Sequence, residues 1–207
     1  LAGQRRDIFE ELLRRNPIGL IRHGDPRAMR LVDKERLLRI LAEHHRDGDV
    51  GDDSLDWTAV AMSAEPELHG GIRLAWETNE RDDFRLDLLR LIRDGKITGA
   101  LDLALGVVAD PKAAEILRLV AADALEACGS LEGRALLGRL LTDENAGLNA
   151  RLAARFALHA FPAHIGVDAL FDVVGRFPHD PSVYDGFKHV LPELWSRGET
   201  DVRRRRF

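Results

Sequence analysis

Three arginines recur at a fixed spacing, and their side chains are the first in this sequence to suggest a binding function. Arg85, Arg118 and Arg151 follow one another at intervals of 33 residues. A guanidinium carries five N–H donors in a rigid fork, so a column of guanidiniums could line a groove for phosphates or acidic peptides. The same forks could instead bond a carboxylate of a neighbouring repeat or the carbonyl oxygens at a helix end. We favour the structural role because each arginine lies at the edge of an apolar stripe.

The eight histidines raise the question of a metal site, because imidazole is a common ligand of zinc and similar ions. His44 and His45 are adjacent, so on a helix their rings would point to different sides. A Phe-Pro pair separates His159 from His164, and no cysteine lies near them. Since a metal site needs three or four converging ligands, we expect none here and interpret these histidines as surface or helix-end residues.

Nucleophilic catalysis would require the single cysteine, Cys128, or a serine beside a base. Cys128 falls on the apolar stripe of a predicted helix, which favours a buried thiol that packs as a small hydrophobic residue. The serines fall in predicted caps, turns or the tail: Ser54, Ser63, Ser130, Ser182 and Ser196. None has the G-x-S-x-G context of a nucleophile elbow, so no catalytic residue is predicted.

We interpret the paired carboxylates and the glycine-rich segments as structural features too. Asp52-Asp53 and Asp82-Asp83 lie just before predicted helices, where they favour the positive end of the helix dipole. Gly95-Lys96-Ile97-Thr98 has Arg90 where a phosphate-binding loop needs its first glycine, and no Ser or Thr follows the lysine directly. Gly70-Gly71 lies within a predicted helix. We expect no nucleotide, cofactor or metal site, so the chain is not expected to be an enzyme.

The elements that position these residues are predicted to be helices. Strand signals are weak, with one tyrosine and no Asn-Gly or Asp-Gly pair between alternating runs. In 111–128 the apolar residues follow one helical face: Ala113, Leu117, Val120, Ala121, Ala124, Leu125 and Cys128. Asp110 can cap this helix, Pro111 suits its first turn, and Gly129 can close it in the left-handed conformation.

Similar patterns predict helices along the rest of the chain, which makes the fold class all-α. The predicted helices are 5–15, 34–46, 53–63, 66–77, 81–94 closed by Gly95, 98–109, 131–142, 147–160, 166–177 and 181–191, with a turn after Asp25-Pro26 and a stub from Glu193 to Trp195.

An internal repeat indicates how these helices are organised. Residues 118–127 read RLVAADALEA and residues 151–160 read RLAARFALHA, with six of ten positions identical. A second predicted helix lies between successive copies, so each unit is a helical hairpin that is stable only when stacked on the next. Alanines let the layers approach closely and Leu125 fills the space between them.

These motifs resemble the HEAT-type repeat of the lyase-like variety, with its V-R-x-x-A-A-x-A-L pattern. The matching residues are Leu117-Arg118, Ala121-Ala122, Ala124-Leu125 and the closing Gly129. The resemblance implies an α-α superhelix, a short right-handed solenoid of helical hairpins. We divide the chain into an irregular helical cap (1–50), HEAT-like repeats (51–178), and a C-terminal helix with a basic tail (179–207). The expected concave surface consists of helices 66–77, 98–109, 131–142 and 166–177.

The wider layout is similar to the C-terminal helical array of bacterial STAND or NACHT-like signalling NTPases. The similar segments are Glu11 to Ile21, Leu88 to Gly95 and Ala160 to Leu170. In such proteins the array is implied to sense a ligand or partner, while a separate domain binds nucleotide. We therefore expect a cytoplasmic, non-catalytic recognition or scaffold region that binds a protein or another domain of the same polypeptide. The first residue is Leu1 and not methionine, so we expect a fragment of a longer chain.

A HEAT-like DNA-binding or DNA glycosylase module is the alternative. It would need a basic concave face, whereas the chain has 30 basic and 35 acidic residues and a net charge of −5. The expected groove helices carry basic Arg73, Arg134, Arg139 and Arg176 and acidic Glu67, Glu77, Asp102, Glu132, Asp168 and Asp172. Arg203 to Arg206 form a basic cluster, which we interpret as a solvated tail. No apolar run approaches the roughly 20 residues that cross a bilayer, so no membrane contact is expected.

Overall fold

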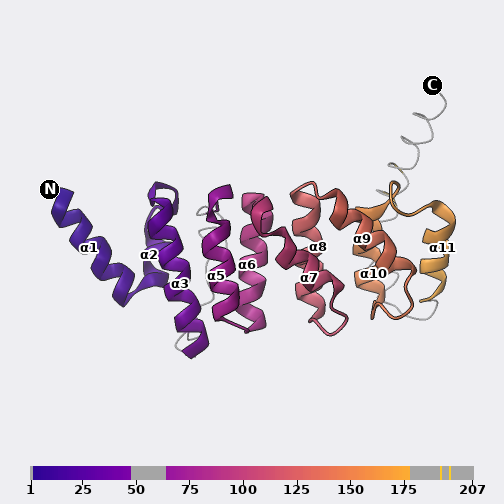
Figure 1. Ribbon diagram of the computed structural model, residues 1–207, viewed down its shortest axis with the longest axis horizontal. Helices are drawn as coiled ribbons and strands as arrows, with labels where there is room; N and C mark the ends of the chain where they lie inside the picture. The colour runs from indigo at the N-terminus through magenta and orange to yellow at the C-terminus, as the bar shows by residue number, and fades with distance from the viewer. Residues whose placement is uncertain (1, 48–63, 178–191, 193–195, 197–207) are drawn as a thin grey trace, which may run out of the picture. The chain divides into compact units, whose positions relative to one another are not determined.

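The structure of this protein is a computed structural model that describes residues 2–47, 64–177, 192 and 196. Within these residues every regular element is a helix (Figure 1), which confirms the predicted all-α class. The chain divides into two compact units, Leu1–Leu103 (unit 1) and Ala104–Phe207 (unit 2). None of the described helices is both long and apolar enough to cross a lipid bilayer.

Unit 1 is built around the longest described helix, α3. Its helices are α1 (Ala2–Arg15), α2 (Pro17–His23), η1 (Pro26–Ala28), α3 (Leu31–Asp47), η2 (Pro66–Leu68), α5 (His69–Thr78), α6 (Asp82–Gly95) and η3 (Thr98–Ala100). Helices α3 and α5 lie side by side (Figure 1), and α6 packs against α5. Leu41 of α3, Ile72 of α5, and Phe84 and Leu88 of α6 are all buried, so apolar contacts hold these helices together.

The corner between α5 and α6 closes the C-terminal end of α3. The last carbonyl groups of a helix have no partner within it and need donors from elsewhere. Asn79 donates from Nδ2 to the main-chain oxygen of Ala42 at 2.8 Å, and Arg81 donates from Nη1 to that of His45 at 3.3 Å. Side chains more than 30 residues along the sequence thus supply the hydrogen-bond donors that the end of α3 lacks.

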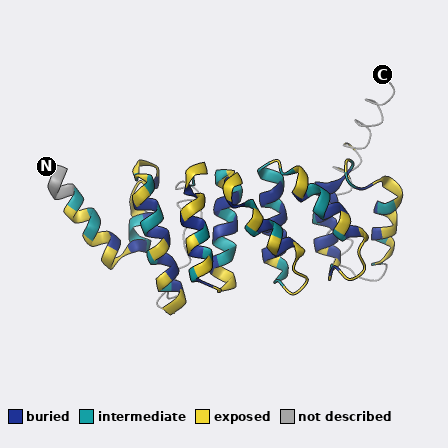
Figure 2. Ribbon diagram, in the orientation of Figure 1, coloured by how far each residue is buried: buried dark blue, intermediate teal, exposed yellow. Residues whose placement is uncertain are grey.

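In its described residues, unit 2 contains four whole helices after α7 (Leu101–Ala109), which begins in unit 1. They are α8 (Glu115–Ala127), α9 (Leu131–Thr142), α10 (Ala150–Ala160) and α11 (Val167–Gly175). Helix α10 packs against α8, α9 and α11, and Figure 2 shows its residues mainly in the buried colour. The α8 and α10 helices therefore form the interior of this unit, while α9 and α11 keep exposed faces.

The seams predicted to be rich in alanine are buried. Ala121 and Ala124 of α8, and Ala154 and Ala157 of α10, have almost no exposed surface, and Leu125 has none. Close approach also requires Gly138 of α9, because a Cβ there would lie 2.5 Å from the main-chain oxygen of His164. The small residues permit the tight packing that the repeat pattern predicted.

Several predicted boundaries are wrong, for local reasons. Helix α8 begins at Glu115 and not at Pro111, because the Asp110 side chain accepts a hydrogen bond from the Lys112 N–H and holds a turn before the helix. Helix α6 includes Gly95, and the left-handed residue that ends it is Lys96, with φ of 49°. Gly129 does take the left-handed conformation after α8, with φ of 69°.

Other differences concern whole segments. Helix α2 was not predicted, although Asn16 caps it and Pro17 occupies its first position. Helix α10 starts at Ala150, three residues later than predicted, and residues 66–68 and 98–100 are single 3₁₀ turns that lead into α5 and α7. The predictions for 53–63, 181–191, 193–195 and 203–206 lie outside the described residues.

Candidate functional site

Arg118 lies inside unit 2, where main-chain oxygens surround its guanidinium. It is 1% exposed, and it donates from Nε and Nη2 to the oxygen of Val108 at 3.2 and 3.1 Å. Its other bonds reach Ala146 at 3.0 Å and Gly147 at 3.1 Å. Burial lowers the pKa of Arg118, but an arginine stays charged in proteins, and hydrogen bonds to the carbonyl oxygens stabilise this charge. Arg118 therefore joins the end of α7 to the turn before α10.

Arg85 and Arg151 lie in different surroundings. The half-buried Arg85 donates from Nε to the oxygen of Asn79 at 3.3 Å, and its guanidinium lies 4.9 Å from the centre of the Trp76 ring. The side chain of Arg151 is 65% exposed and pairs with Glu115 of α8 at 3.3 Å. Arg85 and Arg118 each donate to a carbonyl oxygen at a helix end, and Arg151 pairs with a carboxylate of another helix, as expected for a structural role. They do not form a uniform column.

His45 and His159, two of the histidines weighed as metal ligands, lie in different surroundings. His159 makes a 2.8 Å contact from Nε2 to the Asp123 carboxylate, which Arg155 approaches at 3.5 Å. His45 is buried against the Phe84 ring, 4.9 Å between ring centres, and neither of its ring nitrogens has a hydrogen-bond partner. Burial lowers the pKa of His45. In the part of the chain that the structure describes, no three His, Cys, Asp or Glu side chains are placed to hold a metal ion.

Of the side chains considered as nucleophiles, Cys128 and Ser130 lie at helix ends. Cys128 follows the last residue of α8 and is half-buried, so the prediction of a fully buried thiol is wrong. Its place one residue beyond the helix turns it partly outward. Ser130 caps α9, since its Oγ accepts a hydrogen bond from the Gly133 N–H at 3.0 Å. Asp82 and Asp83 are in the first turn of α6, and a hydrogen bond from Arg81 lowers the pKa of Asp83.

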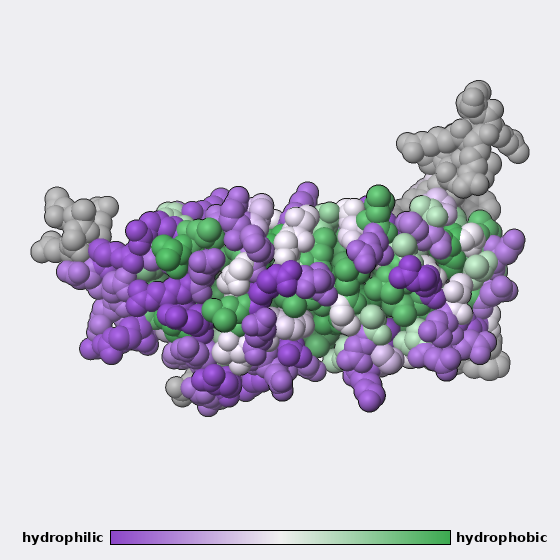
Figure 3. Space-filling view, viewed as in Figure 1, coloured by the Kyte–Doolittle hydropathy of each residue, from purple (hydrophilic) through white to green (hydrophobic). Residues whose placement is uncertain are grey.

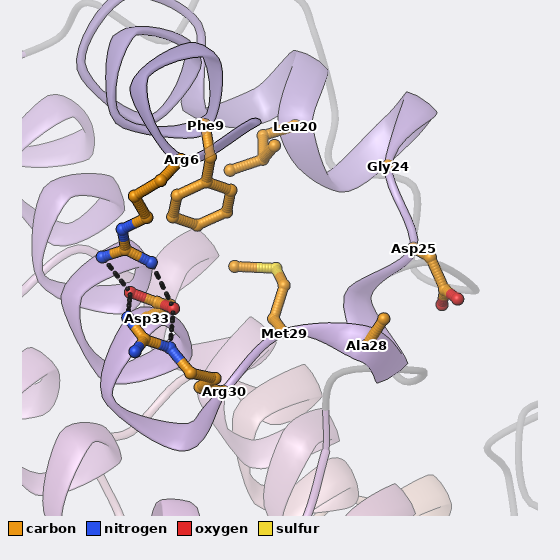
Figure 4. A pocket seen from close by; sticks show the side chains of 9 residues that line it. All are labelled: Arg6, Phe9, Leu20, Gly24, Asp25, Ala28, Met29, Arg30 and Asp33. Atoms are coloured by element: carbon orange, nitrogen blue, oxygen red, sulfur yellow. Dashed lines mark hydrogen bonds and ion pairs between the residues drawn. The ribbon is translucent and has the colours of Figure 1, made fainter. Parts of the chain in front are cut away.

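A cavity of about 410 Å³ lies in unit 1, between α1, α2, η1 and the start of α3 (Figure 4). Its residues are Arg6, Phe9, Leu20, Gly24, Asp25, Ala28, Met29, Arg30 and Asp33. Figure 4 shows Phe9, Leu20 and Met29 around its centre, with Arg6 and Arg30 meeting Asp33 at one end. Asp25 points away from this centre. The cavity therefore combines apolar walls with one cluster of ionised groups.

Asp33 is held between two guanidiniums in this cavity. Arg6 donates to its two oxygens at 2.9 and 3.0 Å, and Arg30 donates at 2.8 and 3.3 Å. These hydrogen bonds lower the pKa of Asp33 to about 2. A carboxylate that stays ionised at neutral pH and has both oxygens occupied is a poor proton donor or nucleophile. The cluster ties α1 to α3, and the sequence signal for it was the i, i+3 pair of Arg30 and Asp33.

Exposed apolar side chains mark another kind of candidate site in unit 2. On α11 the buried residues are Leu170 and Val173, whereas Val167 is 52% and Phe171 67% exposed. Asp168 and Asp172 are exposed beside them. Figure 3 shows hydrophobic and hydrophilic residues interspersed over the face of the molecule that it presents. The sequence contained this signal as two i, i+4 pairs, which we interpreted only as part of a general groove surface.

Comparison of the chain with protein-family models, with curated proteins and with solved structures found no match.

Proposed function

We propose that this chain is a non-catalytic recognition region made of HEAT-like helical repeats, and that it belongs to a larger bacterial ATP- or GTP-binding signalling protein of the cytoplasm. Its partner would be a protein or another domain of the same polypeptide. The single observation that carries the proposal is the outer face of α11, where Val167 and Phe171 are exposed side by side on the helix.

The packing of unit 2 supports the repeat part of the proposal. Helices α8 and α10 carry the two matching sequence copies and pack together through buried alanines. Arg118 bonds the end of the preceding helix and the turn that leads into the next copy, 28 and 29 residues along the chain. Such contacts between successive hairpins are what a right-handed solenoid needs in order to stack.

The exposed apolar side chains support the recognition part. Phe171 occupies a face that the core of its own unit does not use, because Leu170 and Val173 already bury the opposite side of α11. Aromatic side chains, including phenylalanine, are enriched in protein interfaces relative to the rest of the surface. A partner that covers this face would remove apolar surface from water.

A photo-cross-linking amino acid at position 171 of the full-length protein, in its native cells, tests this proposal. The matched control places the same amino acid at Arg139, an exposed position on α9. The partner that is captured must then bind the purified protein, and F171S must weaken that binding about tenfold. If nothing is captured at 171, or if the Phe171 variant binds the partner as tightly as the original, the proposal is wrong.

Two further measurements test the assignment to a larger NTPase without catalytic function in this chain. The complete reading frame should encode a phosphate-loop domain, and the purified chain should not hydrolyse nucleotide. Appreciable hydrolysis would contradict the proposal.

A salt titration with duplex DNA addresses the DNA-binding alternative, because binding through phosphates weakens steeply with salt. Tight DNA binding at about 150 mM salt would favour the alternative.

A further inference from the structure

We propose that the outer face of α11 binds a basic amphipathic helix, whose apolar residues cover Val167 and Phe171 and whose Lys or Arg side chains pair with Asp168 and Asp172. This inference rests on the proposed function and specifies the chemistry of the partner. We call these four residues the α11 face.

The apolar and the acidic side chains of the α11 face form two parallel lines along the helix. Val167 and Phe171 are four residues apart, as are Asp168 and Asp172, so each pair lies in line along the helix. Because consecutive residues are rotated by about 100°, the acidic line lies about 100° around the helix from the apolar line. An amphipathic helix presents apolar and charged residues in the same arrangement.

The charges of the α11 face are unpaired within the described residues. Neither Asp168 nor Asp172 has an ion pair or a side-chain hydrogen bond there. Arg176, the next basic residue along the chain, donates from Nη2 to the main-chain oxygen of Leu141 on α9. Its guanidinium is thus directed to α9, and the α11 face keeps a negative character that complements a cationic partner.

Asp172 lies where its charge is unfavourable for the isolated helix. Asp168 is in the first turn of α11, where a carboxylate favours the helix dipole, but Asp172 begins its last turn, where a carboxylate is unfavourable. Phe171, beside it, exposes 67% of its surface to water. Both residues are unfavourable for the isolated unit, and one partner could offset both.

Fluorescence anisotropy with two synthetic peptides tests the inference. The first peptide is an 18-residue helix with leucines on one face and lysines on the other, and the second has glutamates in place of the lysines. We expect the lysine peptide to bind in a salt-dependent manner and the glutamate peptide not to bind. The double variant D168N/D172N should weaken the lysine peptide roughly five- to thirtyfold. F171A should weaken it about tenfold or more.

L131A is the matched control. Leu131 is 71% exposed and belongs to the same unit, but it is the first residue of α9, whereas Arg176 attaches α11 near the last turn of that helix. L131A should leave peptide binding unchanged. All the substituted side chains are exposed, so circular dichroism should show that each variant folds.

The possible results separate this inference from the proposed function. Equal binding of the lysine peptide to the original protein and to D168N/D172N would overturn the basic character of the partner. If the glutamate peptide binds in a manner that depends on Phe171, recognition by the α11 face stands and only the charge preference is wrong. If neither peptide shows binding that depends on Phe171, the inference is overturned, and the cross-linking experiment then decides the proposed function separately.

Discussion

Arg118 and Val108 are joined by two hydrogen bonds from one guanidinium to one main-chain oxygen, at 3.2 and 3.1 Å. The same side chain bonds the oxygens of Ala146 and Gly147, so a single buried cation serves three main-chain groups in two segments. Buried carbonyl groups without donors are unfavourable, which makes this arginine a point where the stability of unit 2 is concentrated.

Replacement of Arg118 by methionine should therefore lower the free energy of unfolding by about 3–5 kcal/mol, because the buried carbonyls of Val108 and Ala146 lose their donor. R118K should also be destabilising, since an ammonium cannot reproduce the fork. Urea unfolding followed by circular dichroism measures both. R151M is the control, and it should change stability by less than about 1 kcal/mol because the pair that Arg151 forms with Glu115 is exposed. Equal effects of R118M and R151M would contradict the assigned role of Arg118.

The stability of the packing between α8 and its neighbours should depend on the volume of the buried side chains. Leu125 is completely buried and contacts the α9 backbone at Gly133, where a Cβ would lie 2.9 Å from that of Leu125. L125A should lower the free energy of unfolding by about 2–5 kcal/mol through lost apolar burial and a cavity. L131A, an exposed leucine on α9, should change it by less than about 0.5 kcal/mol. Thermal and urea unfolding of the two variants provide the comparison.

His45 should make unit 1 less stable in acid. Burial lowers its pKa below the ordinary value of 6.5, so the unfolded chain takes up a proton first as the pH falls. The free energy of unfolding that the neutral His45 contributes above pH 6.5 is therefore lost progressively as the pH falls below 6.5. Nearby Asp83 opposes this shift, whereas Arg81 and His44 add to it. H45F keeps an aromatic ring against Phe84 and should flatten the dependence of unfolding free energy on pH between about 6.5 and 5.

The control for His45 is its neighbour on the same helix. His44 is half-exposed, so H44Q should retain the pH dependence of the original protein. At pH 7.5 the stability of H45F should differ from that of the original by less than about 1.5 kcal/mol. A steep acid transition that persists unchanged in H45F would show that other groups are responsible.

Asp87 should have the opposite effect at higher pH. Its side chain is 13% exposed, with Arg90 3.5 Å away, and burial raises its pKa to about 8. The folded protein keeps this proton up to about pH 8, while the unfolded chain loses it near pH 4. Stability should therefore fall as the pH rises from 4 to 8, and D87N should be more stable than the original above pH 8 by about 1–3 kcal/mol.

Guanidinium unfolding at pH 5 and pH 8.5 measures this difference. D82N is the control on the same helix, because Asp82 is exposed in the first turn of α6, and its effect should stay within about 0.5 kcal/mol at both values. If D87N destabilises the protein at pH 8.5, the carboxyl of Asp87 is not held in its neutral form.

The sequence predicts the helices best where an apolar stripe and both end signals agree. The 131–142 helix has Ser130 as its cap, and the structure gives the same boundaries. A competing local interaction decided where α8 begins. The Asp110 side chain accepts a hydrogen bond from the N–H two residues ahead and holds a turn there in place of the first helical turn. Asn16-Pro17 carries a helix-start signal, but the seven-residue helix that follows is too short to show periodicity.

The candidate sites were harder to predict, because they depend on which residues meet in space. Arg6 and Asp33 are 27 residues apart, and no pattern within either segment indicates their pairing. The α11 face is visible in the sequence as four residues, but the same spacing would describe a buried stripe. Only the positions of Leu170 and Val173 determine that Phe171 lies outside.

The way in which Asn79 and Arg81 close the end of α3 limits how unit 1 can be divided. A fragment that stops before position 79 would leave the oxygens of Ala42 and His45 without their donors. During synthesis, the last turn of α3 would gain these donors only after the corner before α6 has left the ribosome. The smallest autonomously folding piece that contains α3 should therefore extend beyond Arg81, and this length is the natural truncation limit for dissecting the protein.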